Sequence, residues 1–112
     1  MTNCLFCKMV EGDIKPDVLY EDESVLAFRD INPQAPIHIL IIPKTHISTL
    51  NELDDTQLAG QLIQTAAKLA KIENIAADGY RTVFNCNAKG GQEVYHLHLH
   101  LLAGRQMTWP PG

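Results

Sequence analysis

The sequence lacks an excess of positive charge and any long hydrophobic run. Its 112 residues include nine Lys and Arg against thirteen Asp and Glu, a formal net charge of -4. Binding to a long nucleic acid depends on a basic face that releases counterions, so no nucleic acid polymer is expected as a partner. The longest apolar runs, such as residues 39–42, are far too short to span a bilayer. The first residues also lack the cationic and apolar segments of a signal peptide, so we expect a cytoplasmic protein that does not bind membranes.

Cysteine is also scarce. Three cysteines cannot form a complete disulfide framework, and Cys4-x-x-Cys7 without a signal peptide indicates metal or redox chemistry instead. No βαβ pattern follows this pair, which argues against a redox role. Two thiolates are the usual half of a tetrahedral zinc site, and two distant histidines commonly supply the other half. Cys86 stands alone and is expected to be a small core residue of a strand.

The apolar spacing predicts one α+β domain over residues 1–112, with 104–112 as a C-terminal tail. A short helix over residues 4–11 ends at Gly12, and a long helix begins at an Asp54 cap and continues to residue 72. The expected strands are residues 18–20, 24–30, 37–42, 81–86 and 93–102. They predict a five-stranded antiparallel sheet with one long and one short helix covering one of its faces.

Three of the five histidines follow one another at alternate positions, His96, His98 and His100. On a strand they share one face, and Leu97, Leu99 and Leu101 face the helices on the other. A core gains nothing from three imidazoles that each need a hydrogen-bond partner, so the pattern favours a functional site. Neutral imidazole keeps one lone pair, which can attack an electrophile or bind a metal.

The loop before these histidines offers donors for an anion. Gly90 and Gly91 allow backbone N–H groups to turn toward an oxyanion, and Asn85 and Gln92 add side-chain donors. A plain hairpin turn explains a Gly-Gly pair about equally well. The position directly upstream of the histidines favours phosphate binding.

The run Gly-Gly-Gln-Glu-Val-Tyr-His-Leu-His-Leu-His-Leu-Leu, residues 90–102, resembles the histidine triad (HIT) motif. Residues 27–36 and 104–112 are similar to the histidine triad nucleotide-binding branch of that superfamily, and the resemblance covers nearly the whole chain. It implies a HIT-like homodimer without an organic cofactor that hydrolyses purine nucleoside 5'-phosphoramidates through a covalent nucleotidyl-histidine. Trp109 is a candidate anchor on the second copy. The alternatives are cleavage of dinucleoside polyphosphates, nucleotidyl transfer, and a nucleotide-binding regulatory module with incidental turnover. His100 argues against the transferases, which carry glutamine there.

The resemblance also implies roles for single residues. His98 would be the nucleophile, His100 would contact the phosphate and assist the leaving group, and His38 would support them. A purine nucleotide, AMP, GMP or a phosphoramidate of either, would be bound by the ribose-binding Asp30, by Asn85, Gly91 and Glu93 of the phosphate loop, and by a base pocket of Phe6, Met9, Phe28, Ile31 and Leu40.

Some of these residues have simpler explanations. Without the resemblance, Asp30 could be a turn residue at a strand end, and the five apolar residues could be core. Glu93 stands where some family members have serine. Its carboxylate would repel a phosphate unless it is turned away, protonated or contributing only its backbone N–H.

A zinc site follows from the need to keep the nucleophile free. His98 cannot both attack and bind a metal, whereas His96 can be a ligand and hold its neighbour in place. Family members with such a cysteine pair are similar in also using the histidine of a Lys-x-His segment, here residues 44–46. The predicted ligands of a structural zinc are therefore Cys4, Cys7, His46 and His96, and the alternative is two free surface thiols.

Overall fold

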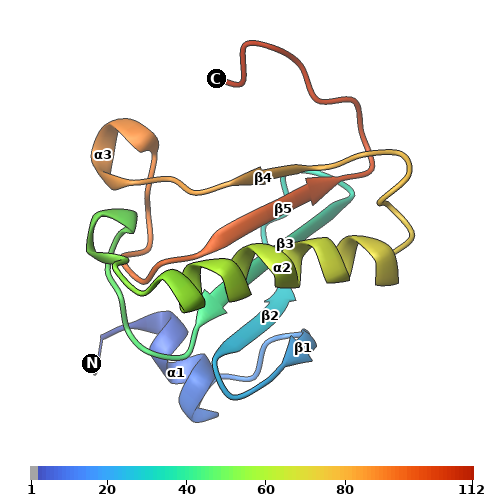
Figure 1. Ribbon diagram of the computed structural model, residues 1–112. Coiled ribbons are helices and arrows are strands. Elements are labelled where there is room, and N and C mark those ends of the chain that lie inside the picture. The colour runs from blue at the N-terminus through green and yellow to red at the C-terminus, as the bar shows by residue number, and fades with distance from the viewer. Residues whose placement is uncertain (1–2) are drawn as a thin grey trace.

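A five-stranded antiparallel sheet forms the centre of the computed structural model, which describes residues 3–112 (Figure 1). The sheet order is β1 (Val18–Glu21), β2 (Val25–Arg29), β3 (Ile37–Pro43), β5 (Leu99–Ala103) and β4 (Arg81–Val83). Every neighbouring pair is antiparallel. The α+β class and the five strands are confirmed, although β4 and β5 are shorter than residues 81–86 and 93–102.

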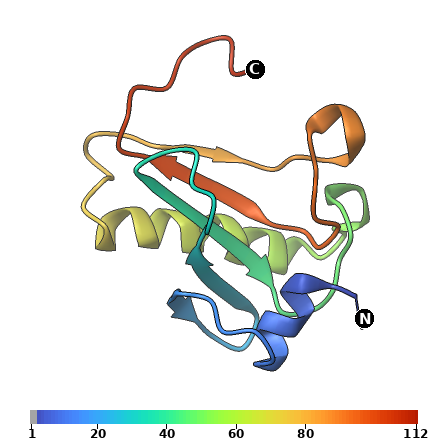
Figure 2. The ribbon, with the colours of Figure 1, turned by 180° about the vertical axis from the view of Figure 1, so that it is seen from behind.

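The two longer helices lie on opposite faces of this sheet (Figures 1 and 2). Helix α2 (Thr56–Ile72) packs on one face and α1 (Leu5–Glu11) on the other. The prediction that both helices cover one face is therefore wrong. The reason lies in β2 and β3, where consecutive residues are apolar and both faces are buried. The α2 face holds Val25, Ala27, Ile39 and Ile41, and the α1 face holds Leu26, Phe28, Leu40 and Ile42.

Two short helices that the sequence did not predict precede α2 and β5 in the chain. A 3-10 helix, η1 (Leu50–Glu52), leads to α2, whose N-cap is Asp55 rather than Asp54: its carboxylate accepts the Leu58 N–H at 3.1 Å. A four-residue helix, α3 (Asn87–Gly90), occupies part of the expected loop. Cys86 is half-buried at the N-terminus of α3, not within a strand as expected.

The histidine segment is only partly a strand. His96 and His98 precede β5, and the backbone N–H of Leu97 donates to the Ile47 carbonyl at 2.6 Å. The expected alternation is nevertheless present. Leu97, Leu99 and Leu101 lie in the core under α2, and the rings of His96 and His98 contact Phe6 of α1. The sheet therefore places the imidazoles on the α1 side. Among residues 3–112, no helix is long and apolar enough to cross a membrane.

Two glycines should respond oppositely to substitution by alanine. Gly104 has φ +92°, and a Cβ there would lie 2.8 Å from the Cβ of Pro36. Gly60 lies inside α2, and a Cβ there meets nothing within 4 Å. We expect Gly104→Ala to lower the free energy of unfolding by about 1–3 kcal/mol, and Gly60→Ala to raise it by about 0.5–1 kcal/mol. Urea unfolding of both variants measures the difference, and equal effects would contradict it.

Candidate active site and metal centre

His98 is held so that one ring nitrogen stays free. Its Nδ1 lies 2.8 Å from the carbonyl oxygen of His96. A carbonyl only accepts, so Nδ1 carries the proton and Nε2 keeps its lone pair. Burial lowers the pKa of His98 below its ordinary value, against the opposing effect of the His96 carbonyl. The neutral ring that results can act as a nucleophile.

His38 and His100 form a second hydrogen-bonded unit beside His98. The backbone N–H of Gln34 donates to His38 Nδ1 at 3.0 Å, so a neutral His38 carries its proton on Nε2. That N–H then donates to His100 Nδ1 at 2.9 Å, which leaves the proton of His100 on its Nε2. Burial, first of all, and the neighbouring histidines lower the pKa of His100 to about 4. Burial also lowers the pKa of His38, against the opposing charge of Asp30. Both rings are therefore neutral at pH 7.

The Nε2 atom of His100 is the one fully buried side-chain nitrogen or oxygen without a hydrogen-bond partner within residues 3–112. Its ring lies against that of His98, with 4.9 Å between the centroids. A buried donor without an acceptor is costly, and such groups occur at sites that bind a ligand. His100 thus offers an unpaired N–H beside the free lone pair of His98.

Asp30 is a turn residue, and its second carboxylate oxygen faces the histidines. One carboxylate oxygen accepts the Asn32 N–H at 2.8 Å, as a turn residue does, and the other lies 3.5 Å from His38 Nε2. Asp30, His38 and His100 are close enough to surround a metal. They are poorly suited to one, because His38 Nε2 already carries a proton and has no lone pair to donate. The carboxylate therefore remains available to hydroxyl donors.

Four of the five residues expected in the base pocket lie together on the α1 face. Phe6, Phe28 and Leu40 are buried in one cluster, and Met9 packs against it. The Phe6 ring meets the His98 ring edge to face at 5.2 Å, so the cluster adjoins the candidate nucleophile. Ile31 is 95% exposed and lies outside the cluster, because it sits in the loop beyond β2. None of residues 3–112 packs over its side chain.

The phosphate-loop residues surround α3. Asn85 is half-buried before it, Gly91 follows it with φ +81°, and Glu93 is exposed. Gln92 does not supply the expected free donor, and that prediction is wrong. Its amide donates to the Ser48 and Val94 carbonyls at 2.8 and 3.1 Å, and its oxygen accepts from Asn87. The Gln92 side chain therefore stabilises the loop. Its partner Ser48 is distant in the sequence, so the contact could not be predicted from the position of Gln92.

A hollow of about 680 Å³ lies between β4 and the C-terminal residues. Asn85 and Gly90 line one end of it, and Arg81, Leu102 and Trp109 line the rest with their neighbours. None of the triad histidines lines it. The hollow therefore adjoins the phosphate loop without containing the nucleophile.

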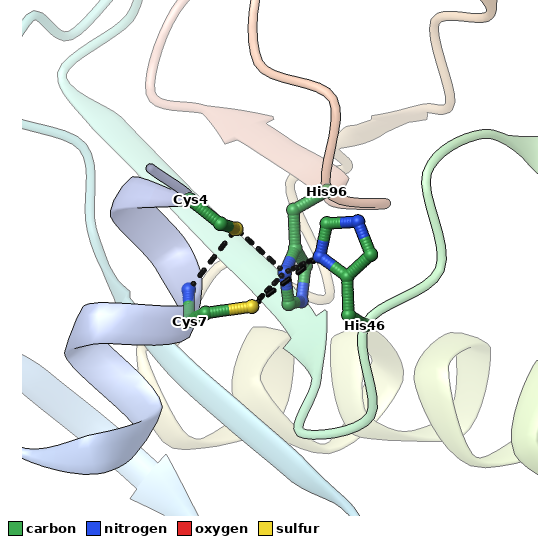
Figure 3. Close-up of side chains that lie close together, drawn as sticks. All are labelled: Cys4, Cys7, His46 and His96. Carbon is green, nitrogen blue, oxygen red and sulfur yellow. Dashed lines mark hydrogen bonds between the residues drawn. The ribbon is translucent and has the colours of Figure 1, made fainter. Parts of the chain in front are cut away.

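The two cysteines converge with two histidines at the start of α1 (Figure 3). Cys4 Sγ lies 3.3 Å from His96 Nδ1, Cys7 Sγ lies 3.3 Å from His46 Nδ1, and the two Nδ1 atoms are 3.2 Å apart. Around a tetrahedral zinc, ligand atoms are separated by roughly 3.3–3.8 Å, given usual Zn–N and Zn–S lengths. The spacing thus fits a four-ligand zinc site.

The protonation states of the cluster fit a metal as well. His96 Nε2 lies 2.8 Å from the Pro43 carbonyl and must donate to it, so its Nδ1 lone pair faces the cysteines. Burial and the neighbouring Cys4 raise the pKa of the Cys7 thiol to about 11. A bound divalent cation would offset that cost and hold both thiols as thiolates. These are the same four residues that the sequence analysis predicts as zinc ligands.

Comparisons with known proteins agree with this geometry. Residues 11–107 match the family model described as HIT domain. The purine nucleoside phosphoramidase of Escherichia coli (strain K12) is 51% identical over 105 residues, covering 92% of this chain and 88% of that protein. The 14 kDa zinc-binding protein of Zea mays is 51% identical over 112 residues, and the alignment covers 96% of this chain and 87% of that protein. A crystal structure of a HIT family hydrolase from Legionella pneumophila Philadelphia 1 has 59% identity and a TM-score of 0.95, covering 98% of this chain and 100% of that chain.

Proposed function

Because the chain belongs to the HIT domain family, we propose that it hydrolyses purine nucleoside 5'-phosphoramidates. The observation that carries the proposal is the hydrogen bond from His98 Nδ1–H to the His96 carbonyl, 2.8 Å long, which leaves Nε2 as a free nucleophile. The relative in Escherichia coli is named a purine nucleoside phosphoramidase, which supports the choice of substrate. The free thiols of this chain fit the cytoplasm, where we place it.

The reaction has two displacements at phosphorus. In the first, His98 Nε2 forms a bond to the α-phosphorus and the phosphorus–nitrogen bond breaks; the departing nitrogen takes a proton from solvent, while the His100 Nε2–H donates a hydrogen bond to the reacting group. In the second, a water oxygen bonds to phosphorus, the bond to His98 Nε2 breaks, and the proton of that water passes to solvent. The products are an amine and a nucleoside monophosphate. The unpaired His100 N–H and its fixed tautomer support this role.

The nucleotide would lie along the α1 face of the sheet. Asp30 would accept from the ribose hydroxyls with the oxygen that its turn leaves open, and Asn85 and the N–H groups near Gly91 and Glu93 would meet the phosphate. An exposed Glu93 side chain fits a backbone contribution better than a direct one. The base would rest on Phe6, Met9, Phe28 and Leu40, with Ile31 as an exposed outer contact.

Cys4, Cys7, His46 and His96 would hold a zinc ion in a structural role. Four protein ligands close a tetrahedral site and leave no position for substrate, so the ion would tie α1 to the histidine segment. The His96 carbonyl also accepts the proton of His98, which links the cluster to the nucleophile. The name of the relative in Zea mays, a zinc-binding protein, supports the assignment.

We expect adenosine 5'-phosphoramidate to be a better substrate than a diadenosine polyphosphate. The neutral His100 N–H can donate a hydrogen bond to a departing amine, whereas a polyphosphate leaves as an anion that brings more negative charge near Asp30 and Glu93. Steady-state kinetics with both compounds gives the ratio of kcat/KM, which we expect to exceed about a hundredfold, some 2.7 kcal/mol in the barrier. A higher kcat/KM for the polyphosphate would reverse the assignment.

We also propose that two chains associate through β4 and the C-terminal residues. Strand β4 is a sheet edge, Trp109 is 82% exposed, and the hollow beside β4 is lined by both segments. Analytical ultracentrifugation should show a dimer at micromolar concentration and more monomer for Trp109→Ala. Ile63→Ala, which trims another exposed apolar side chain, the 57% exposed Ile63 on α2, is the control and should stay dimeric. A monomeric parent protein would refute the proposal.

A further inference from the structure

The loop between β2 and β3, residues 30–36, determines which nitrogen of His38 carries a proton. Its Gln34 backbone N–H is the donor to His38 Nδ1, at 3.0 Å. If Gln34 moved away, Nδ1 could carry the proton instead, and His38 Nε2 would then no longer donate to His100. The position of the Gln34 N–H in this loop thus determines which ring nitrogens of His38 and His100 carry protons.

The beginning of the C-terminal tail contacts the other backbone end of the same residue. Arg105 Nε–H donates to the Gln34 carbonyl oxygen at 3.1 Å. The Gln34 residue is thereby held at both backbone ends, with its N–H on His38 and its carbonyl on Arg105. Its side-chain amide adds a bond to the Asn32 carbonyl at 3.1 Å.

Strand register brings the tail to the loop. Ile37 of β3 pairs with Ala103 of β5, so the residues beyond this pair, Pro36 and Gly104, meet at the sheet end. An added Cβ on Gly104 would lie 2.8 Å from the Pro36 Cβ, which shows how closely the Gly104 backbone approaches the Pro36 ring. Arg105 therefore starts from a fixed point beside the loop, and its exposed side chain needs only a short path to Gln34.

We propose that Arg105 is a positioning residue of the active site: by holding the Gln34 carbonyl, it keeps the Gln34 N–H on His38, which fixes the tautomer of His38 and, through it, the N–H that His100 presents to substrate. The effect on turnover rests on the proposed hydrolysis, whereas the effect on the tautomer does not. Arg105 touches neither substrate nor histidine, so its substitution should act on kcat more than on KM.

The test compares two exposed cationic side chains. Arg105→Gln removes the Nε–H donor to Gln34, and Arg105→Lys keeps a cationic donor. Lys68→Gln is the matched control, because Lys68 is also an exposed cation in contact with the chain, 4.6 Å from the centroid of the Tyr20 ring, but it lies on α2 on the other face of the sheet. Nuclear magnetic resonance of isotope-labelled histidine nitrogens, recorded without substrate, reports the His38 tautomer, and steady-state kinetics with adenosine 5'-phosphoramidate gives kcat and KM.

We expect Arg105→Gln to show a mixture of His38 tautomers and a kcat about tenfold lower, as for the loss of one hydrogen bond, with KM within about twofold. Arg105→Lys should recover most of both signals, and Lys68→Gln should match the parent protein. An unchanged His38 spectrum in Arg105→Gln, an unchanged kcat despite a changed spectrum, or an equal effect of Lys68→Gln would overturn the inference. If the parent protein does not cleave the phosphoramidate, the proposed function fails, and the spectra still decide the tautomer.

Discussion

His98→Ala is expected to lower kcat for adenosine 5'-phosphoramidate by at least about a thousandfold, because it removes the atom that bonds to phosphorus. The nucleotide should still bind, since the proposed contacts of Asp30 and the apolar cluster at Phe6 do not depend on the His98 ring. Rapid quenching and mass spectrometry of the parent protein should find adenylate on His98. Isothermal titration of the variant with AMP should give a Kd within about tenfold of the parent value.

The control for this experiment is His100→Gln. It keeps the nucleophile and replaces the unpaired N–H with an amide that can still donate, so adenylate should form on His98 more slowly. Hydrolysis by His98→Ala within about tenfold of the parent rate would refute the assignment of His98. Adenylate found on another residue would do so as well.

The sequence was sufficient to predict the HIT family and the α+β sheet, both of which are confirmed. Local patterns carry this information: the alternation of His and Leu at residues 96–101 specifies opposite faces, and the structure separates them as expected. The four cysteine and histidine residues predicted as a set do converge in space. That prediction came from a motif shared with relatives, since residues 7 and 46 are far apart in the chain.

The faces covered by the helices could not be predicted from the same patterns. Strand residues such as Leu40 and Ile41 are apolar in succession, and such a run does not say which helix covers which face. The tautomers of the histidine rings could not be predicted from the sequence either. They depend on carbonyls and N–H groups brought close by folding, such as Gln34 beside His38 and the His96 carbonyl beside His98. Their partners follow from tertiary structure and from no spacing in the sequence.

Loss of the proposed zinc site should destabilise the protein more than any other single change outside the sheet core. In Cys7→Ser, a hard hydroxyl replaces the thiolate, and His96, which is fully buried, would face a site that binds zinc weakly. We expect zinc content to fall from about one ion per chain to near zero, and the free energy of unfolding to fall by at least about 3 kcal/mol. Plasma mass spectrometry measures the metal, and chemical unfolding measures the stability.

Cys86→Ser is the control, because it makes the same substitution at a half-buried cysteine outside the cluster. It should leave the zinc content unchanged. If the two variants bound equal zinc and unfolded alike, the cluster would not be a zinc site.

Turnover adds a separate readout of the structural role. His96 presents its side chain to the cluster and its carbonyl to His98, so release of the ion should lower kcat even though no ligand touches the substrate. A zinc-free protein that folds but turns over slowly would therefore show that the metal orients the nucleophile through the His96 backbone.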